Sequence, residues 1–217
     1  MTRKHSLPYF PRDYLGEKAV EYDNLAWMER NQKNTTLKCV EYLFDPTLGN
    51  YELMDYSNYL ILDMGCGTGF STEVLFNLGF NVVAIDILMD MLERAYQKKV
   101  CRYEKSLEEL LLASISMLPF KPQIFDFILS ISAYNFIIHN KSEIKSIKRV
   151  LNDTARTLSC ILKEKGRMVI EFYPHNEKEL HLFVSSFISN NFNGFYIKDN
   201  PDQTGGQTFL LLKKEVK

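Results

Sequence analysis

The sequence lacks the features that mark membrane and secreted proteins. No stretch approaches the roughly 18 uncharged apolar residues that span a bilayer. The amino-terminal stretch contains Arg3 and Lys4 but no apolar core of the secretory kind. A basic excess is also missing, because 26 Lys and Arg stand against 27 Asp and Glu, for a net charge of −1. Since a freestanding nucleic-acid binder usually shows such an excess, charge alone ranks RNA and DNA low as partners.

Cysteine and histidine are too few and too scattered to form a recognisable site. The four cysteines contain no C-x-x-C pair and the four histidines no H-x-x-x-H pair. Disulfide frameworks and zinc sites need close or patterned spacing, so we expect reduced thiols and no metal site. What remains is typical of one globular domain: 217 residues, of which 46% are apolar and 24% charged.

Short apolar runs alternate with amphipathic stretches along the chain. Helical periodicity over residues 17–44, with a break expected at 31–36, precedes a strand at 59–62 and a glycine-rich turn. Further strands are expected at 81–86, 110–115, 125–131, 168–172, 195–198 and 208–212, and further helices after Ser71 and at 89–99, 141–165 and 177–189. This order predicts an α/β fold of the Rossmann-like, doubly wound kind. Its seven-stranded sheet would be mostly parallel, with an antiparallel carboxy-terminal hairpin.

The glycine-rich turn follows the first predicted strand, where Asp63 precedes Gly65, Gly67 and Gly69. Ligands of such sheets bind beyond the carboxyl ends of the strands, and glycine lets a ligand approach the main chain closely. The spacing G-x-G-x-G differs from the G-x-G-x-x-G of dinucleotide-binding turns, and Phe70 stands where the third glycine would be. A nicotinamide oxidoreductase is therefore disfavoured.

The motif D-x-G-x-G-x-G resembles the first motif of class I S-adenosylmethionine-dependent methyltransferases. The resemblance implies that Asp63 lies near the methionine amino group of S-adenosyl-L-methionine. Asp86, which ends the next strand, would accept hydrogen bonds from both ribose hydroxyls, and Ile87 would lie against the adenine. The glycine turn would line the amino acid and ribose with Gly65, Cys66, Gly67 and Gly69. The alternative is that the two acids merely cap strand ends.

Blocks further along the chain narrow the resemblance. In chain order they are Leu118-Pro119-Phe120, Phe125-Asp126, Ser130-Ile131-Ser132-Ala133, Glu171-Phe172-Tyr173-Pro174 and Asp199-Asn200-Pro201. Together they resemble the eukaryotic guanine-N7 methyltransferases of 18S rRNA, which act in small-subunit ribosome biogenesis. The resemblance runs over about residues 8–212, and Tyr14, Glu17, Ala19 and Tyr22 resemble the family's opening helix. It implies one methyltransferase domain over 1–217, in which residues 1–50 cover the cofactor site and residues 58–213 form the core.

The chain departs from this family at two places. Asn135 and Phe136 stand where glutamine and tryptophan are usual, and Ala113 and Ser114 stand where an acid near the adenine amino group is usual. Ser114 can still accept one hydrogen bond. The resemblance also implies cofactor contacts by Ser130 and Tyr22. Tyr22 would close over the cofactor from the amino-terminal helix, and the alternative is that it only packs between helices.

Guanine N7 carries a lone pair and no proton, so its methylation is a direct in-line displacement that needs no general base. The protein must hold the nucleophile, the methyl carbon and the sulfur in line, and an unstacked guanine is typically held by aromatic faces and edge contacts. We expect Asn135 to bond the base edge, Phe136 to stack on the base and Tyr173 to form another wall. Tyr134 is a further candidate, and core packing is the alternative for all these aromatics.

The resemblance also implies partners: rRNA in the pre-40S particle and a small zinc-ribbon activator protein, with a location in nucleus and cytoplasm. The activator would add its sheet to the exposed edge at residues 110–115, where Leu110, Leu111 and Leu112 are unusual for an edge strand. Burial of this strand by its own helices is the alternative. A basic run, Lys141, Lys145, Lys148 and Arg149, would share one helical face, which is either solvated or in contact with phosphates.

Two other functions remain open at the level of sequence. One is a small-molecule or protein methyltransferase of the same fold, which shares the Leu-Pro-Phe and Phe-Asp signals. The other is a non-catalytic pre-ribosome assembly factor that keeps the fold as a binding module.

Overall fold

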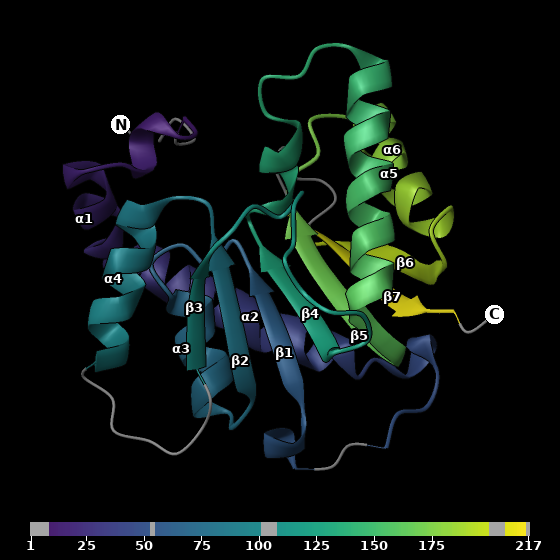
Figure 1. The fold of residues 1–217 in the computed structure, drawn as a ribbon, viewed down its shortest axis with the longest axis horizontal. Coiled ribbons are helices and arrows are strands. Elements are labelled where there is room, and N and C mark those ends of the chain that lie inside the picture. Colours follow the sequence, from purple (N-terminus) through teal and green to yellow (C-terminus); the bar gives the residue numbers. More distant parts are fainter. Residues whose placement is uncertain (1–8, 53–54, 101–107, 200–206, 216–217) are drawn as a thin grey trace.

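The computed structural model describes residues 9–52, 55–100, 108–199 and 207–215. In it, seven strands form one sheet in the order β3-β2-β1-β4-β5-β7-β6 (Figure 1). Strands β1 to β5 run parallel, whereas β7 is antiparallel to both β5 and β6. The strands are β1 (Leu60–Met64), β2 (Asn81–Asp86), β3 (Glu108–Leu112), β4 (Phe125–Ile131), β5 (Leu162–Phe172), β6 (Phe192–Lys198) and β7 (Thr208–Lys214). The predicted α/β, doubly wound fold with its antiparallel hairpin is confirmed.

Helices cover both faces of the sheet and bury two separate cores. Side chains from α2, α3 and α4 pack on one face, and side chains from α5 and α6 pack on the other (Figure 1). Neighbours such as Ile61 and Leu62 belong to opposite cores, because successive side chains of a strand point to opposite faces. The α-helices are α1 (Glu17–Asp23), α2 (Ala26–Leu43), α3 (Phe70–Asn77), α4 (Met89–Val100), α5 (Ile144–Ile161) and α6 (Glu177–Ile188). The short 3₁₀ turns are η1 (Arg12–Tyr14), η2 (Pro46–Leu48), η3 (Tyr56–Asn58) and η4 (Tyr134–Ile138).

The predicted helix at 141–165 is wrong at both ends. Helix α5 begins only at Ile144, and the chain passes directly into β5 at Leu162, which pairs with Phe125 of β4. Gly166, expected to end the helix, lies inside β5, where an added Cβ would come 2.6 Å from the Leu162 side chain. Strand pairing therefore overrides a helical pattern that continues past Ile161.

Two further local predictions are wrong. The break in the amino-terminal helices falls at Asn24 and Leu25 rather than at 31–36, and α2 runs on with the Thr36 hydroxyl donating to the Gln32 carbonyl. Ser71 does not cap α3, because Gly69 is the N-cap residue and Ser71 lies within the helix.

Strand β3 forms one edge of the sheet, as predicted, but begins two residues earlier than expected. The predicted connection at 201–206 lies outside the described residues. No helix in the described part of the chain is long and apolar enough to cross a membrane.

Candidate active site

The glycine turn closes the carboxyl end of β1 and is fastened to its neighbours. The amides of Gly65 and Cys66 both donate to the Ile85 carbonyl, at 2.8 and 2.9 Å. Gly65 has φ +74° and lies so close to Ala133 that an added Cβ would meet the Ala133 Cβ at 2.2 Å. Only glycine fits there, because any side chain would push the turn away from the segment that follows β4. Cys66 is buried, and burial raises the pKa of its thiol.

Asp63, at the end of β1, is a buried carboxylate with one oxygen left open. Its side chain is 1% exposed, and its Oδ2 accepts hydrogen bonds of 2.7 Å from the hydroxyls of both Ser71 and Thr72. Its Oδ1 has no hydrogen-bond partner among the described residues. Burial raises the pKa of Asp63 to about 6. Ser71 therefore positions this acid instead of capping a helix.

Asp86 ends β2 and holds the turn from the other side. Its Oδ2 accepts from the Gly67 amide and its Oδ1 from the Leu88 amide, both at 2.9 Å. Each carboxylate oxygen can accept a second hydrogen bond, so the two bonds leave capacity for the ribose hydroxyls expected from the sequence. Burial raises the pKa of Asp86. The adjoining Ile87 is 52% exposed.

Ser114 lies beside the end of β2, because the preceding Ala113 amide donates to the Asp86 carbonyl at 2.9 Å. Its hydroxyl is 2.9 Å from that of Ser116. Ser130 is placed differently: it is fully buried, and its hydroxyl donates to the Met64 carbonyl at 3.0 Å. This bond joins β4 to β1, and the contact of Ser130 with the cofactor stays a prediction.

Glu171, at the end of β5, belongs to the site although only the block that contains it was noted in the sequence. It is fully buried, and its Oε2 accepts from the amide and the hydroxyl of Ser132, both at 2.7 Å. Its Oε1 is open, with no hydrogen-bond partner in the described residues. Burial raises the pKa of Glu171. A lone acid at the end of an apolar strand was the signal that could have identified it.

Tyr22 reaches across the site from α1. Its ring stacks on Phe70 at the start of α3, with centroids 6.4 Å apart. Burial raises the pKa of the Tyr22 hydroxyl, and the charges of Tyr14, Asp86 and Glu171 raise it further. Tyr173 lies near Glu171, and its pKa is raised by burial and by that charge.

Three of the residues expected to hold a base, Tyr134, Asn135 and Phe136, are on η4, whereas Tyr173 follows β5. Asn135 has a buried amide oxygen without a partner in the described residues. Phe136 carries the ring of Phe10 stacked on it, at 4.6 Å between centroids and 19° between planes, and Tyr14 meets it edge-on. Tyr134 is fully buried against Phe183 and Phe187, two core residues of α6. The alternative of core packing therefore holds for Tyr134.

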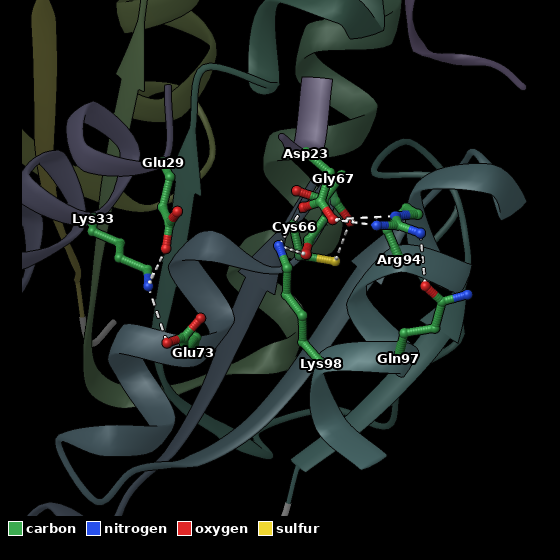
Figure 2. A network of polar contacts seen from close by, with 10 residues as sticks. Asp23, Glu29, Lys33, Cys66, Gly67, Glu73, Arg94, Gln97 and Lys98 are labelled. Carbon is green, nitrogen blue, oxygen red and sulfur yellow. Dashed lines mark hydrogen bonds and ion pairs between the residues drawn. The ribbon is translucent and has the colours of Figure 1, made fainter. Parts of the chain in front are cut away.

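An ion-pair cluster fastens α1 to α4 and to the glycine turn (Figure 2). Asp23, 5% exposed at the end of α1, accepts from Arg94 at 3.0 and 3.1 Å and also from Lys98. Lys98 donates in addition to the Thr68 carbonyl, at 2.9 Å, and lies over the Phe70 ring. At the other end of α1 the Gly16 amide donates to Asp90 of α4. Helix α1 is thus anchored at both ends, which no sequence pattern indicated.

Three carboxylates, Asp63, Asp86 and Glu171, therefore stand at the ends of three parallel strands; Asp63 and Glu171 are buried and Asp86 is half-buried. None of the ion pairs found in the described part of the chain involves any of them. Uncompensated buried acids favour a cationic ligand, because a positive charge relieves the cost of desolvation. The two open oxygens, on Asp63 and Glu171, provide the acceptors.

Comparison with known proteins gives the class first. Residues 62–159 match a family model described as a methyltransferase domain. The solved structure of an S-adenosylmethionine-dependent methyltransferase from Clostridium acetobutylicum superposes with a TM-score of 0.64, covering 92% of this chain and 98% of that one at 17% identity. The chain therefore contains a methyltransferase domain with the fold of the class I S-adenosylmethionine-dependent methyltransferases, and S-adenosyl-L-methionine is the cofactor of that class. The resemblance seen in the sequence is confirmed.

Within this class, the chain is similar to enzymes of 18S rRNA. The 18S rRNA (guanine-N(7))-methyltransferase bud23 of Schizosaccharomyces pombe is 31% identical over 163 residues, which are 74% of this chain and 59% of the relative. The 18S rRNA (guanine-N(7))-methyltransferase of Bos taurus is 32% identical over 153 residues, covering 70% of this chain and 52% of the relative. The chain thus spans between half and three fifths of the length of these relatives.

Proposed function

We propose that this chain transfers the methyl group of S-adenosyl-L-methionine to guanine N7 in small-subunit rRNA during ribosome biogenesis. The observation that carries the proposal is its similarity, over 70% or more of the chain, to relatives from fungi and mammals that are named for this reaction. A Dictyostelium discoideum relative named as a probable 18S rRNA (guanine-N(7))-methyltransferase covers 92% of the chain at 25% identity. The similarity therefore extends beyond the cofactor-binding half.

The charges of the site support the cofactor. S-adenosyl-L-methionine bears a sulfonium and an ammonium group, and the open oxygens of Asp63 and Glu171 are acceptors suited to the ammonium. The second lone pairs of Asp86 suit the ribose hydroxyls. A pyrophosphate-bearing dinucleotide would instead bring negative charge toward these three acids. The other proposed contacts are the glycine turn (Gly65, Cys66, Gly67, Gly69), with Ile87 and Ser114 at the adenine and Tyr22 as a cover.

Residues 9–43 support the proposal that the amino-terminal segment covers the cofactor. Tyr22 stacks on Phe70 at the start of α3, and α1 is fastened to α4 and to the glycine turn through Asp23 and Lys98. A ligand held by the strand ends would lie beneath this helix. The cover would exclude water and fix the cofactor while the base approaches.

For this reaction the protein has to orient the cofactor and the base relative to each other. When bound, the cofactor supplies a methyl group on a positively charged sulfur, and the lone pair of guanine N7 attacks it without losing a proton. We assign Asn135 to the base edge, where its unpartnered amide group can bond. Phe136 would stack on the base, and Tyr173 would form the opposite wall. The Phe10 ring stacks on one face of the Phe136 ring, so the Phe10 side chain must move for a base to stack on that face.

The free edge of β3 supports the proposed partner, a small zinc-ribbon activator that extends the sheet. Leu111 is 37% exposed and Leu112 54%, and no other strand of the described chain pairs beyond them. The alternative, burial of β3 by the chain's own helices, is thereby wrong. A strand added at this edge would cover both leucines. We propose that the pair works on pre-40S rRNA in the nucleus and cytoplasm.

Two measurements test the proposal. Calorimetry with S-adenosyl-L-methionine, on the chain alone and co-expressed with the activator, should show binding that the Glu171→Gln variant weakens at least tenfold. The exposed Glu164→Gln variant is the matched control and should bind as the wild type does. Mapping of N7-methylguanine in small-subunit rRNA after depletion of the protein should show loss of one modification.

Each alternative function has its own result in these assays. Absence of cofactor binding in both preparations would leave a non-catalytic assembly factor. Binding without any loss of N7-methylguanine would leave a methyltransferase for another substrate, small molecule or protein.

A further inference from the structure

Helix α5 carries a row of basic side chains along its outer face. Lys145, Lys148, Arg149 and Arg156 are all exposed. At about 100° per residue they fall within a strip about 100° wide. The buried leucines of the helix, Leu151 and Leu158, lie outside this strip. We call these four residues the basic face of α5. Lys141, expected in the same row, precedes the helix and is not part of it.

The charge of this face is not compensated by its own helix. Asp153 is the single acid of α5, and it is shared between Arg149 at 3.7 Å and Arg156 at 3.2 Å. Within the described residues, Lys145 and Lys148 form no ion pair. The chain as a whole has a net charge of −1, so the excess of positive charge on this face is local.

The lysines also stand at the wrong end of the helix for stability. The amino-terminal end of a helix has a partial positive charge, where acids stabilise and bases destabilise. The first turn of α5 has no acid, and the N-cap residue, Glu143, makes no capping hydrogen bond with its side chain. Lysines at this end of the helix therefore do not stabilise the fold through the helix dipole. An anion bound there would contact both the lysine side chains and the amides of the first turn, which have no partner within the helix.

The basic face begins beside the proposed base site. The 3₁₀ turn η4, which carries Asn135 and Phe136, directly precedes α5 along the chain and packs against it. Both follow the carboxyl end of β4, and α5 then runs back along the sheet (Figure 1). Lys145 and Lys148, in the first turns of α5, are thus the basic residues of the row that lie closest along the chain to Phe136.

We propose that the basic face of α5 binds the phosphodiester backbone of the RNA strand that presents the target base. The inference rests on the proposed function, because it takes RNA as the substrate. The phosphates flanking the unstacked base would lie along Lys145, Lys148 and Arg149, with Arg156 further from the site. Such contacts carry no sequence information and position the strand.

The test compares two double variants of the full chain in RNA binding. The probe is a fluorescein-labelled single-stranded RNA containing guanine, titrated at several salt concentrations. Each phosphate contact on a single strand contributes about 0.7 to the slope of log K against log salt. The Lys145→Ala/Lys148→Ala variant should lower that slope by about 1.4, and weaken binding about 25-fold at about 0.1 M salt.

The matched control removes the same charge at the opposite end of the sheet. Lys121 and Lys165 are exposed and adjoin the amino-terminal ends of β4 and β5. The Lys121→Ala/Lys165→Ala variant should keep the wild-type slope, and both double variants should keep the wild-type affinity for S-adenosyl-L-methionine.

The outcomes separate this inference from the proposed function. Equal slopes for both double variants, with RNA binding and methylation by the wild type intact, would overturn the assignment of the basic face alone. A wild type that binds the cofactor but neither binds nor methylates RNA would overturn the proposed substrate and the basic face with it.

Discussion

Replacing Asp23 with alanine should loosen the cover over the cofactor without disturbing the sheet. Asp23 is the acid that joins α1 to both Arg94 and Lys98 of α4 (Figure 2). Its side chain is 5% exposed and those of its partners 26% and 25%. The variant would leave two partly buried cations facing an empty place at the end of α1.

The magnitude follows from this intermediate burial. Removing one partner from a fully buried pair costs about 3–5 kcal/mol, and an exposed pair is worth at most about 1 kcal/mol. A quarter-exposed cluster should lie between, at about 2 kcal/mol. If that free energy holds α1 closed, the open state becomes about 30-fold more populated. The dissociation rate of S-adenosyl-L-methionine should then rise by up to the same factor.

Stopped-flow displacement of S-adenosyl-L-methionine measures that rate directly. The matched control is Glu73→Ala, which breaks the 3.0 Å pair between α3 and Lys33 of α2 but leaves α1 untouched (Figure 2). Asp23→Ala should speed dissociation, whereas Glu73→Ala should lower stability only. Equal dissociation rates for the two variants would refute the reasoning, because α1 would then not limit cofactor release.

Three other outcomes follow from single side chains. Because burial raises the pKa of Asp63 to about 6 from an ordinary 3.8, its protonated form stabilises the fold at low pH. Urea unfolding between pH 4 and pH 7 should therefore show the ligand-free wild type losing up to about 3 kcal/mol relative to Asp63→Asn as the pH rises. Ser130→Ala should lower the unfolding free energy by about 1 kcal/mol and leave cofactor affinity, measured by calorimetry, unchanged. Phe10→Ala should expose the Phe136 ring and lower the KM for RNA by about 3- to 10-fold in a methylation assay, whereas an unchanged KM would mean that the base does not use that ring.

The sheet was predictable because its strands are short apolar runs that end at glycine or at an acid. The boundary between α5 and β5 was not. Leu158 and Leu162 continue the helical spacing, and no proline or glycine intervenes before Gly166. Only the pairing of Leu162 with Phe125 fixes the start of β5. That pairing joins residues far apart in the sequence, which periodicity cannot reveal.

The candidate site likewise contains residues that the sequence predicts and residues that only the fold reveals. Asp63 was predictable because it lies at the end of a strand, directly before the glycine turn. Asp86 was predictable because it ends the next strand along the chain. Glu171 acquires its place from Ser132, 39 positions earlier in the chain, which bonds one oxygen and leaves the other open. On η4, Tyr134 is buried in the core and Phe136 lies against the amino-terminal segment. A run of adjacent aromatics does not show which member faces which side.

The near-zero net charge was an argument against an RNA partner, and the structure changes what that number means. Three acids, two buried and one half-buried, stand at the strand ends without a basic partner among the described residues, and four basic side chains line the outside of α5 with one acid among them. A sum over the chain cancels these two groups, although they would act on different ligands. The acids attract a cationic cofactor, and the basic face suits a polyanion. Because Debye screening limits exposed charges to about 8–10 Å, an RNA strand on α5 would respond to the local lysines and not to the total. A weakly acidic chain can therefore hold both a cation and an RNA.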